Sequence, residues 1–77
     1  MSDVEQWLEA NAPALAAVAQ ECAVEARVVR LVAVLVLAGL DDQEIRDQLV
    51  SALDVRDSDL SVEAGVRTVP RIRRLAA

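Results

Sequence analysis

The sequence contains no histidine, lysine, phenylalanine or tyrosine, and it has a single cysteine, Cys22. Without histidine the chain lacks the usual general base at neutral pH and the commonest metal ligand. One cysteine cannot close a disulfide within the chain or build a cysteine-rich zinc site. The two glycines, Gly39 and Gly65, are too few for a glycine-rich phosphate loop. We therefore expect a protein that is not an enzyme and that holds no cofactor or metal.

The apolar residues that remain are mainly Ala, Val and Leu, with Trp7 as the only aromatic side chain. Hydrophobic residues make up 55% of the 77 positions, which argues against a disordered acidic tail and predicts one small domain over residues 1–77. Cys22 stands among Ala and Val residues, and we expect it to behave as a small apolar residue of the core. The acidic first residues and the absence of a disulfide framework favour a cytoplasmic protein.

Apolar residues spaced three and four positions apart predict an all-α fold, a compact bundle of five to six short helices. Ser2 and Glu5 fit a capping box ahead of the first helix, and Pro13 suits the first turn of the second. Asp41 and Asp42 place negative charge at the start of the fourth helix, where the helix dipole favours it. The four helices predicted on these grounds span residues 3–10, 13–22, 25–38 and 42–53.

The segment from Val28 to Leu40 is almost entirely apolar and has three interpretations. As a membrane span it is short, because its 13 residues, Arg30 among them, fall below the roughly 20 that a bilayer requires. As a buried strand it is rich in valine, but the chain offers no convincing second strand to pair with it. We favour a central helix over residues 25–38. Because its second half has no polar face, we expect this helix to be buried on every side.

The last part of the chain alternates polar and apolar stretches. Residues 54–61 are polar and rich in turn formers, which predicts a loop. A short helix over residues 59–64 can end at Gly65. Thr68 can then cap a final helix that has Pro70 in its first turn.

Residues 15–32 resemble the helix-turn-helix motif of DNA-binding proteins. That motif places a small residue where the second helix crosses the first, and a turn residue, usually glycine, four positions later. Ala19 occupies the crossing position here and Ala23 the turn position. An alanine at the turn position departs from the glycine of the motif. A left-handed backbone conformation costs alanine more free energy than it costs glycine. The apolar offsets of the motif are occupied by Val18, Cys22, Val24, Val29 and Val32.

The resemblance implies that helix 25–38 is a recognition helix for double-stranded DNA. Arg27 and Arg30 lie three positions apart, so they share one face and can read guanine or bind phosphate. The alternative, which the sequence favours slightly, is that both are ordinary surface arginines at the start of a buried helix, paired with Glu25 or Glu21. Glu25 also repels phosphate. Both interpretations stay open on the sequence alone.

Charge is divided unevenly within a net charge of −5. Residues 1–26 carry five acids and no base, whereas residues 66–77 carry four arginines and no acid. This basic segment can contact phosphate, complement a helix dipole, or balance the acidic N-terminal third. Residues 38–45 also resemble the start of the DNA-binding domains of resolvases and response regulators, although the arginine-rich segment follows only after a polar gap. The candidate DNA-binding residues are Arg27, Arg30, Arg67, Arg71, Arg73 and Arg74.

Two functions follow from these patterns. The first is a small non-enzymatic regulator that binds double-stranded DNA through the helix-turn-helix-like pair. The alternative is a helical protein–protein interaction module, an adaptor, inhibitor or self-associating domain that binds no nucleic acid. A chain of this length has few helices with which to cover the central one, so we expect a homodimer in which part of residues 31–40 lies at the interface.

Overall fold

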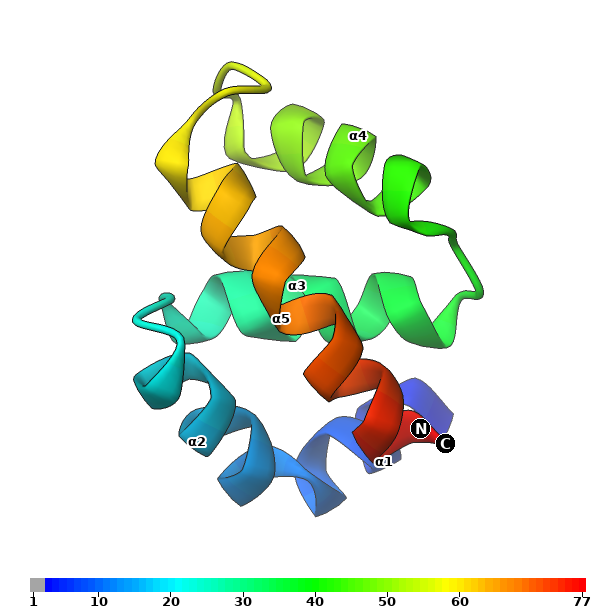
Figure 1. Ribbon diagram of the computed structural model, residues 1–77. Coiled ribbons are helices and arrows are strands. Elements are labelled where there is room, and N and C mark those ends of the chain that lie inside the picture. The colour runs from blue at the N-terminus through cyan, green and yellow to red at the C-terminus, as the bar shows by residue number, and fades with distance from the viewer. Residues whose placement is uncertain (1–2) are drawn as a thin grey trace.

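The computed structural model describes residues 3–77, and five helices account for most of them (Figure 1). The all-helical prediction is confirmed, and no strand is present in the part of the chain that is described, so the central apolar segment is a helix. The first four predicted helices are each placed within one residue of the observed bounds. Ser2 of the predicted capping box lies outside the described residues. The helices are α1 (Asp3–Ala10), α2 (Ala12–Glu21), α3 (Ala26–Leu37), α4 (Asp42–Leu53) and α5 (Leu60–Ala76).

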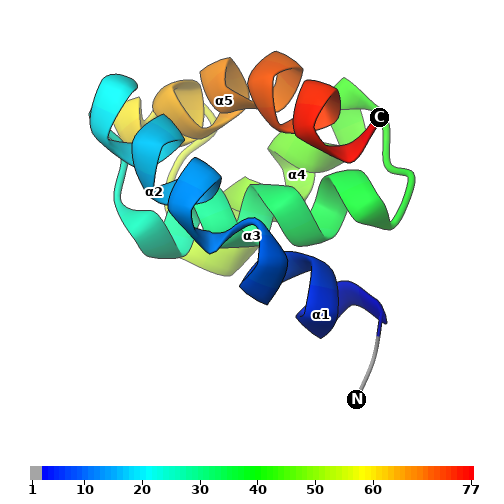
Figure 2. The same cartoon turned by 90° about the horizontal axis from the view of Figure 1, so that it is seen from below.

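Helices α3 and α5 cross at the centre of the molecule and make its most extensive helix–helix contact (Figure 1). Helix α4 packs against both of them, and α2 packs against both from the other end of the crossing. Figure 2 shows α1 on the side of α3 that faces away from α5. The radius of gyration, 11.5 Å, is the value expected of one compact body of this length. The completely buried apolar side chains at the centre are Val32, Ala33, Ile45, Leu49, Val62 and Ile72.

Gly65 lies inside α5 at this crossing and is buried. A Cβ atom at this position would lie 3.0 Å from Cδ1 of Leu49 and 3.1 Å from Cγ1 of Val28. The absence of a side chain therefore lets α5 approach α3 and α4 closely. Glycine costs a helix interior about 1 kcal/mol relative to alanine, and packing of the surrounding apolar side chains offsets that cost.

The prediction of two short helices at the C-terminal end is wrong, because α5 runs without interruption through Gly65, Thr68 and Pro70. Thr68 does not cap a helix start. It is buried in mid-helix, and its hydroxyl donates a hydrogen bond of 2.6 Å to the carbonyl of Gly65 one turn earlier. Pro70 is exposed, so the carbonyl of Val66 that its missing N–H leaves free lies on the solvated side of the helix. Burial of the opposite side outweighs the local preference of these residues to end a helix.

Helix α3 is not buried on every side, which corrects a second expectation. Val28, Val29, Val32 and Ala33 are buried, whereas Leu31 and the stretch from Val34 to Leu37 are only half-buried. The reason is geometric: α5 covers the inner side of α3, and the short α1 is the helix nearest to its outer side. Among the described residues no helix has both the length and the apolar character needed to cross a membrane.

Three of the helices end in the same way. At the end of α2, the amide of Val24 donates to the carbonyl of Ala19 and the amide of Ala23 donates to the carbonyl of Gln20. These two bonds form a Schellman motif, in which the residue after the cap is left-handed and the next residue is apolar. The left-handed residues are Ala23 and Asp54, each with φ +54°, and Gly39, with φ +83°. The apolar residues that follow them, Val24, Leu40 and Val55, are half-buried against the core.

The left-handed conformation of Ala23 generates a stability prediction. Alanine is disfavoured there by about 1–2 kcal/mol relative to the right-handed region, whereas glycine is not. We expect Ala23→Gly to raise the free energy of unfolding by roughly 1 kcal/mol, which is a shift of several degrees in melting temperature.

Ala16→Gly is the matched control, because Ala16 is exposed inside α2 with no left-handed backbone. We expect that change to lower stability by about 1 kcal/mol. Thermal unfolding followed by circular dichroism measures both variants. Destabilisation by Ala23→Gly would show that the turn does not have this geometry.

Candidate functional site

The turn between α2 and α3 brings together the residues of the helix-turn-helix resemblance. Ala19 is buried at 9% exposure, and Ala23 is left-handed, as a turn residue at this offset must be. Glu25 is the N-terminal capping residue of α3 in extended conformation, but its side chain makes no capping hydrogen bond. It accepts instead from Nε of Arg27 at 2.6 Å. The same Schellman geometry ends α3 and α4, so the turn by itself accounts for how α2 ends and does not specify a ligand.

The six candidate arginines occupy four different places. Arg27 and Arg67 line one pocket, and Arg71 and Arg74 line a second pocket, of about 420 Å³, between α2 and α5. Arg30 lines a third, smaller pocket between α1, α2 and α3. Arg73 extends to the start of α4. The structure therefore joins Arg27 with Arg67 and Arg71 with Arg74, and it leaves Arg30 and Arg73 apart from both pairs.

Three of these arginines form ion pairs within the molecule. Arg27 pairs with Glu25, Arg71 with Glu21, and Arg73 with Asp42, whose carboxylate lies 2.6 Å from Nη1 of Arg73. The hydrogen bond from Arg71 to Glu21 raises the pKa of that guanidinium above its ordinary value, although burial opposes the shift. Arg71 also donates to the sulfur of Cys22 at 3.9 Å. Arg30, Arg67 and Arg74 form no hydrogen bond or ion pair with any residue that the structure describes.

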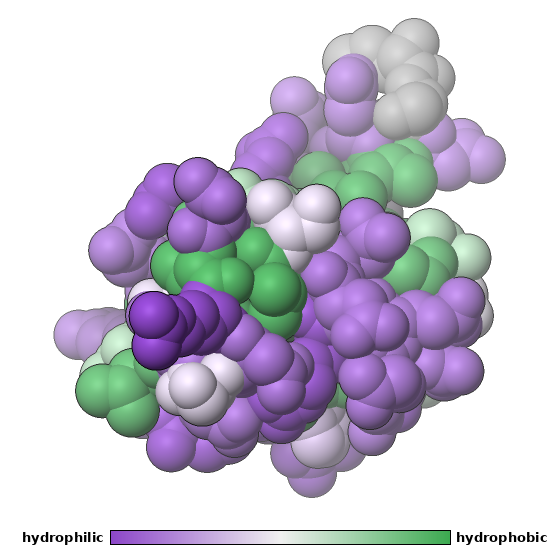
Figure 3. All heavy atoms as spheres, turned by 90° about the horizontal axis from the view of Figure 1, so that it is seen from above, coloured by the Kyte–Doolittle hydropathy of each residue, from purple (hydrophilic) through white to green (hydrophobic). Residues whose placement is uncertain are grey.

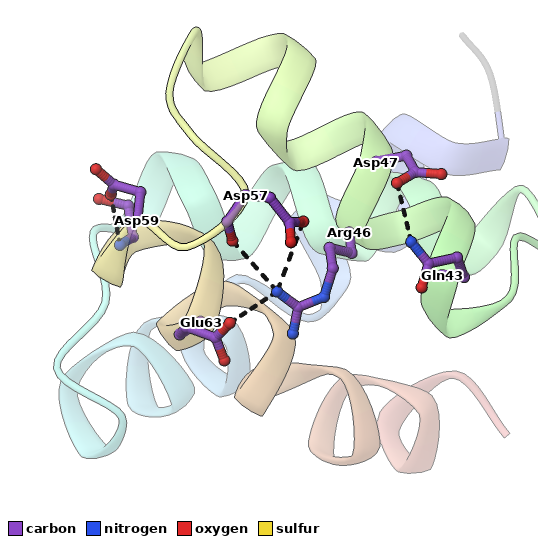
Figure 4. A network of polar contacts seen from close by, with 7 residues as sticks. Gln43, Arg46, Asp47, Asp57, Asp59 and Glu63 are labelled. Carbon is purple, nitrogen blue, oxygen red and sulfur yellow. Dashed lines mark hydrogen bonds and ion pairs between the residues drawn. The ribbon is translucent and has the colours of Figure 1, made fainter.

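Sequence reasoning missed the residue with the densest polar contacts, Arg46 on α4. Its Nη1 lies 2.7 Å from Glu63 on α5 and 3.8 Å from the carboxylate of Asp57 (Figure 4). It also donates to the backbone carbonyl of Asp57 at 3.4 Å. Arg46 therefore fastens the 54–59 loop and the first turns of α5 to α4. No local pattern could reveal this cluster, because Arg46 is separated from its partners by 11 and 17 positions.

The hydrogen bond from Arg46 lowers the pKa of the Glu63 carboxyl, and the charge of Arg46 adds to that effect. The same hydrogen bond raises the pKa of Arg46. Both groups are therefore ionised at neutral pH. The pair connects α4 to the first turns of α5. Neither side chain changes its protonation state near neutral pH, so neither can serve there as a general acid or base.

Glu63 also lines a pocket of about 380 Å³, which we call the turn pocket. It lies between the α2–α3 turn, the end of α4 and the first turns of α5. Figure 3 shows the face over α4, where hydrophilic side chains surround separate apolar patches. Leu60, on the rim of the turn pocket, is the one large apolar residue among those described that is strongly exposed, at 84%. The pocket is lined by Ala23, Val24, Glu25, Arg27, Val28, Leu53, Val55, Leu60, Ser61, Glu63, Ala64 and Arg67.

Comparison with models of protein families, with curated proteins and with solved structures finds no match to this chain. Within residues 3–77 no group of three or more acidic or cysteine side chains is placed to hold a metal ion. The features from which a function can be inferred are therefore the chain's own arginines, its helix pair and its turn pocket.

The Arg46–Glu63 pair predicts a dependence of stability on pH. The folded pKa of Glu63 is below its ordinary value of 4.5, so its contribution is complete above that pH and is lost as the pH falls through the folded pKa. We expect the wild-type protein to lose more stability than Glu63→Gln between about pH 6 and pH 3.

Urea denaturation at a series of pH values measures this difference. Arg46→Gln serves as the control background, because Glu63 there keeps only the weaker charge interaction with Arg67, and the Glu63→Gln substitution then removes less acid sensitivity. Equal acid sensitivity of the wild type and Glu63→Gln would contradict the prediction.

Proposed function

We propose that this protein is a small non-enzymatic regulator that binds double-stranded DNA through α2, the turn and α3. The observation that carries the proposal is the exposure of Arg27 and Arg30 in the first turns of α3, directly after a turn whose left-handed residue stands at the offset of a helix-turn-helix motif. Such a helix can enter the major groove with its N-terminal residues facing the base edges. Arg67 shares the turn pocket with Arg27 and supplies a further cation near the start of α3.

The electrostatics favour Arg30 and Arg67 as the first phosphate contacts. Both are exposed and have no ion pair with a described residue, so their guanidinium groups meet phosphate without losing an internal partner. Arg27 must exchange Glu25 for DNA, because its Nε lies 2.6 Å from that carboxylate. The exchange costs little, because the side chains of both partners are more than two-thirds exposed, at 75% and 68%.

DNA binding is tested with Arg27→Ala/Arg30→Ala in a gel-shift titration against a random-sequence duplex. We expect the wild type to bind with an affinity that falls steeply between about 50 and 200 mM salt. The double variant is expected to bind at least about tenfold more weakly, with a salt slope reduced by about 1 for each phosphate that it no longer neutralises.

Arg56→Ala is the control, because Arg56 is an exposed arginine of the α4–α5 loop and lies outside all three pockets. It removes one unit of positive charge without touching α3, and we expect nearly unchanged binding. Circular dichroism verifies that each variant stays helical. A wild-type protein that shifts no duplex at low salt, or an Arg56 variant as weak as the double variant, would overturn the proposal.

The second candidate function is a self-associating interaction module, and the outer side of α3 favours it. Leu31, Val34 and Leu37 follow one another at three-residue intervals along α3 and are only half-buried. Leu37 is half-buried without packing against the buried core. Burying these side chains against a second copy of the chain removes apolar surface from water, at about 25 cal/mol per Å². The interaction is then a homodimer formed through α3, as the sequence of residues 31–40 predicts.

Sedimentation equilibrium tests this candidate. A dimer at high micromolar concentration has twice the 8.3 kDa mass of one chain. We expect Leu37→Asp to give the mass of a single helical chain, because it places a charge in the interface and not in the monomer core. Leu60→Asp makes the same change on an exposed residue of α5 and should leave the mass unchanged. A wild-type mass of one chain throughout would exclude the dimer.

A further inference from the structure

The turn pocket combines apolar side chains with the guanidinium of Arg67, which forms no hydrogen bond or ion pair with a described residue. Its walls come from three separate segments of the chain, within residues 23–28, 53–55 and 60–67, which the α3–α5 crossing and the Arg46 cluster hold in place. Its volume of about 380 Å³ lies within the range of about 300–1,000 Å³ that is typical of small-molecule sites. The apolar side chains of the lining are those of Ala23, Val24, Val28, Leu53, Val55, Leu60 and Ala64.

The charged residues of the turn pocket differ in whether they form an ion pair. Glu25 and Arg27 neutralise each other through a bond of 2.6 Å. Glu63 is held by Arg46 at 2.7 Å, and Arg46 lies outside the pocket lining. Arg67 is four residues beyond Glu63 on α5, yet it forms no hydrogen bond or ion pair with any described residue. Two arginines and two glutamates line the pocket, so its formal charge is balanced. Arg67 acts on Glu63 through its charge alone, and its guanidinium is left without a hydrogen-bonded partner among the described residues.

We propose that the turn pocket binds a small organic monocarboxylate whose body is aliphatic or aromatic. The carboxylate pairs with the guanidinium of Arg67, whose planar fork matches the two oxygens of a carboxylate. The apolar body replaces water against the Val24, Val28 and Leu53 side chains. A doubly charged ligand such as phosphate suits the pocket less well, because Glu25 and Glu63 match the two arginines of the lining and only Arg67 is without an ion pair.

Such a ligand would contact the turn between α2 and α3 and the side chain of Arg27. The site does not depend on DNA binding, and it goes beyond the proposed function by adding a small-molecule ligand next to the helix pair. Its experiment contains no DNA, so its failure and the failure of the DNA-binding proposal are distinguishable.

The experiment is a titration followed by methyl NMR, with 3-phenylpropionate, its neutral amide and acetate as probes. We expect saturable shifts with 3-phenylpropionate, at a dissociation constant of about 1 mM or below, that are largest for the methyl groups of Val24, Val28 and Leu53. The amide lacks the charge and acetate lacks the apolar body. Both should bind at least about tenfold more weakly.

Arg67→Gln and Arg74→Gln form the matched pair of variants. Both arginines are exposed on α5 and lack an internal ion pair, but Arg74 lies outside the turn pocket. We expect Arg67→Gln to weaken 3-phenylpropionate binding at least about tenfold and Arg74→Gln to change it less than about twofold. The proposal is overturned by a lack of saturable shifts up to about 10 mM, by equal binding of acid and amide, or by equal effects of the two variants.

Discussion

The close contact of α5 with α3 at Gly65 is the constraint on which the rest of the molecule depends. Ala, Val and Leu are short side chains, and a core built from them is filled only if the helix backbones come close together. Gly65 provides that approach, with Leu49 and Val28 pressed against the position that a side chain would occupy. The crossing fixes the direction of α5, and with it the location of every arginine that α5 carries. The pockets that flank α5 are a result of the same crossing.

Polar contacts in this protein connect helices that the apolar core has already positioned. Arg46 reaches Glu63 across the α4–α5 connection, Arg71 reaches Glu21 on α2, and Arg73 reaches the start of α4. Each of these pairs is at least partly exposed, so each contributes little stability by itself. Their main effect is on the charge of the surface. Four of the eight arginines of this acidic chain are neutralised by acidic side chains of the same molecule. Four guanidinium groups have no ion pair with a described residue, those of Arg30, Arg56, Arg67 and Arg74. Three of them, on Arg30, Arg67 and Arg74, line pockets and are the strongest candidates to contact a partner.

The first four helices could be predicted from the sequence because local signals and tertiary packing agree there. Pro13, Asp41 and Gly39 stand where helices start or end, and the apolar spacing between them is regular. The C-terminal part could not be predicted in the same way. Gly65 and Pro70 are helix breakers by local preference, and their presence inside α5 depends on what packs against the helix. The residues that pack against Gly65 are Val28, Val32 and Leu49, which are far away in the sequence.

The candidate site shows the same division. Helical spacing places Arg27 and Arg30 in the first turns of α3, where both are exposed, because that depends on neighbours within one or two turns. It does not predict the left-handed backbone of Ala23, because alanine adopts that conformation at a cost and the turn position is implied only by the resemblance. It cannot predict that Arg67 comes to lie beside the α2–α3 turn, because that depends on how α5 crosses α3. The Arg46 cluster escapes prediction for the same reason. The four arginines of residues 66–77 form one basic segment in the sequence. Helix α5 places them on different sides of the molecule.

Trp7 gives the molecule an unusual optical property. It is half-buried on α1, and its carbonyl accepts hydrogen bonds from the backbone amide and the side chain of Asn11 at the junction with α2. Because the chain has no other aromatic residue, its ultraviolet emission reports on the packing of α1 alone. Amide absorption reports on all five helices together. Comparing the two signals during unfolding therefore separates detachment of the outermost helix from collapse of the α3–α5 centre.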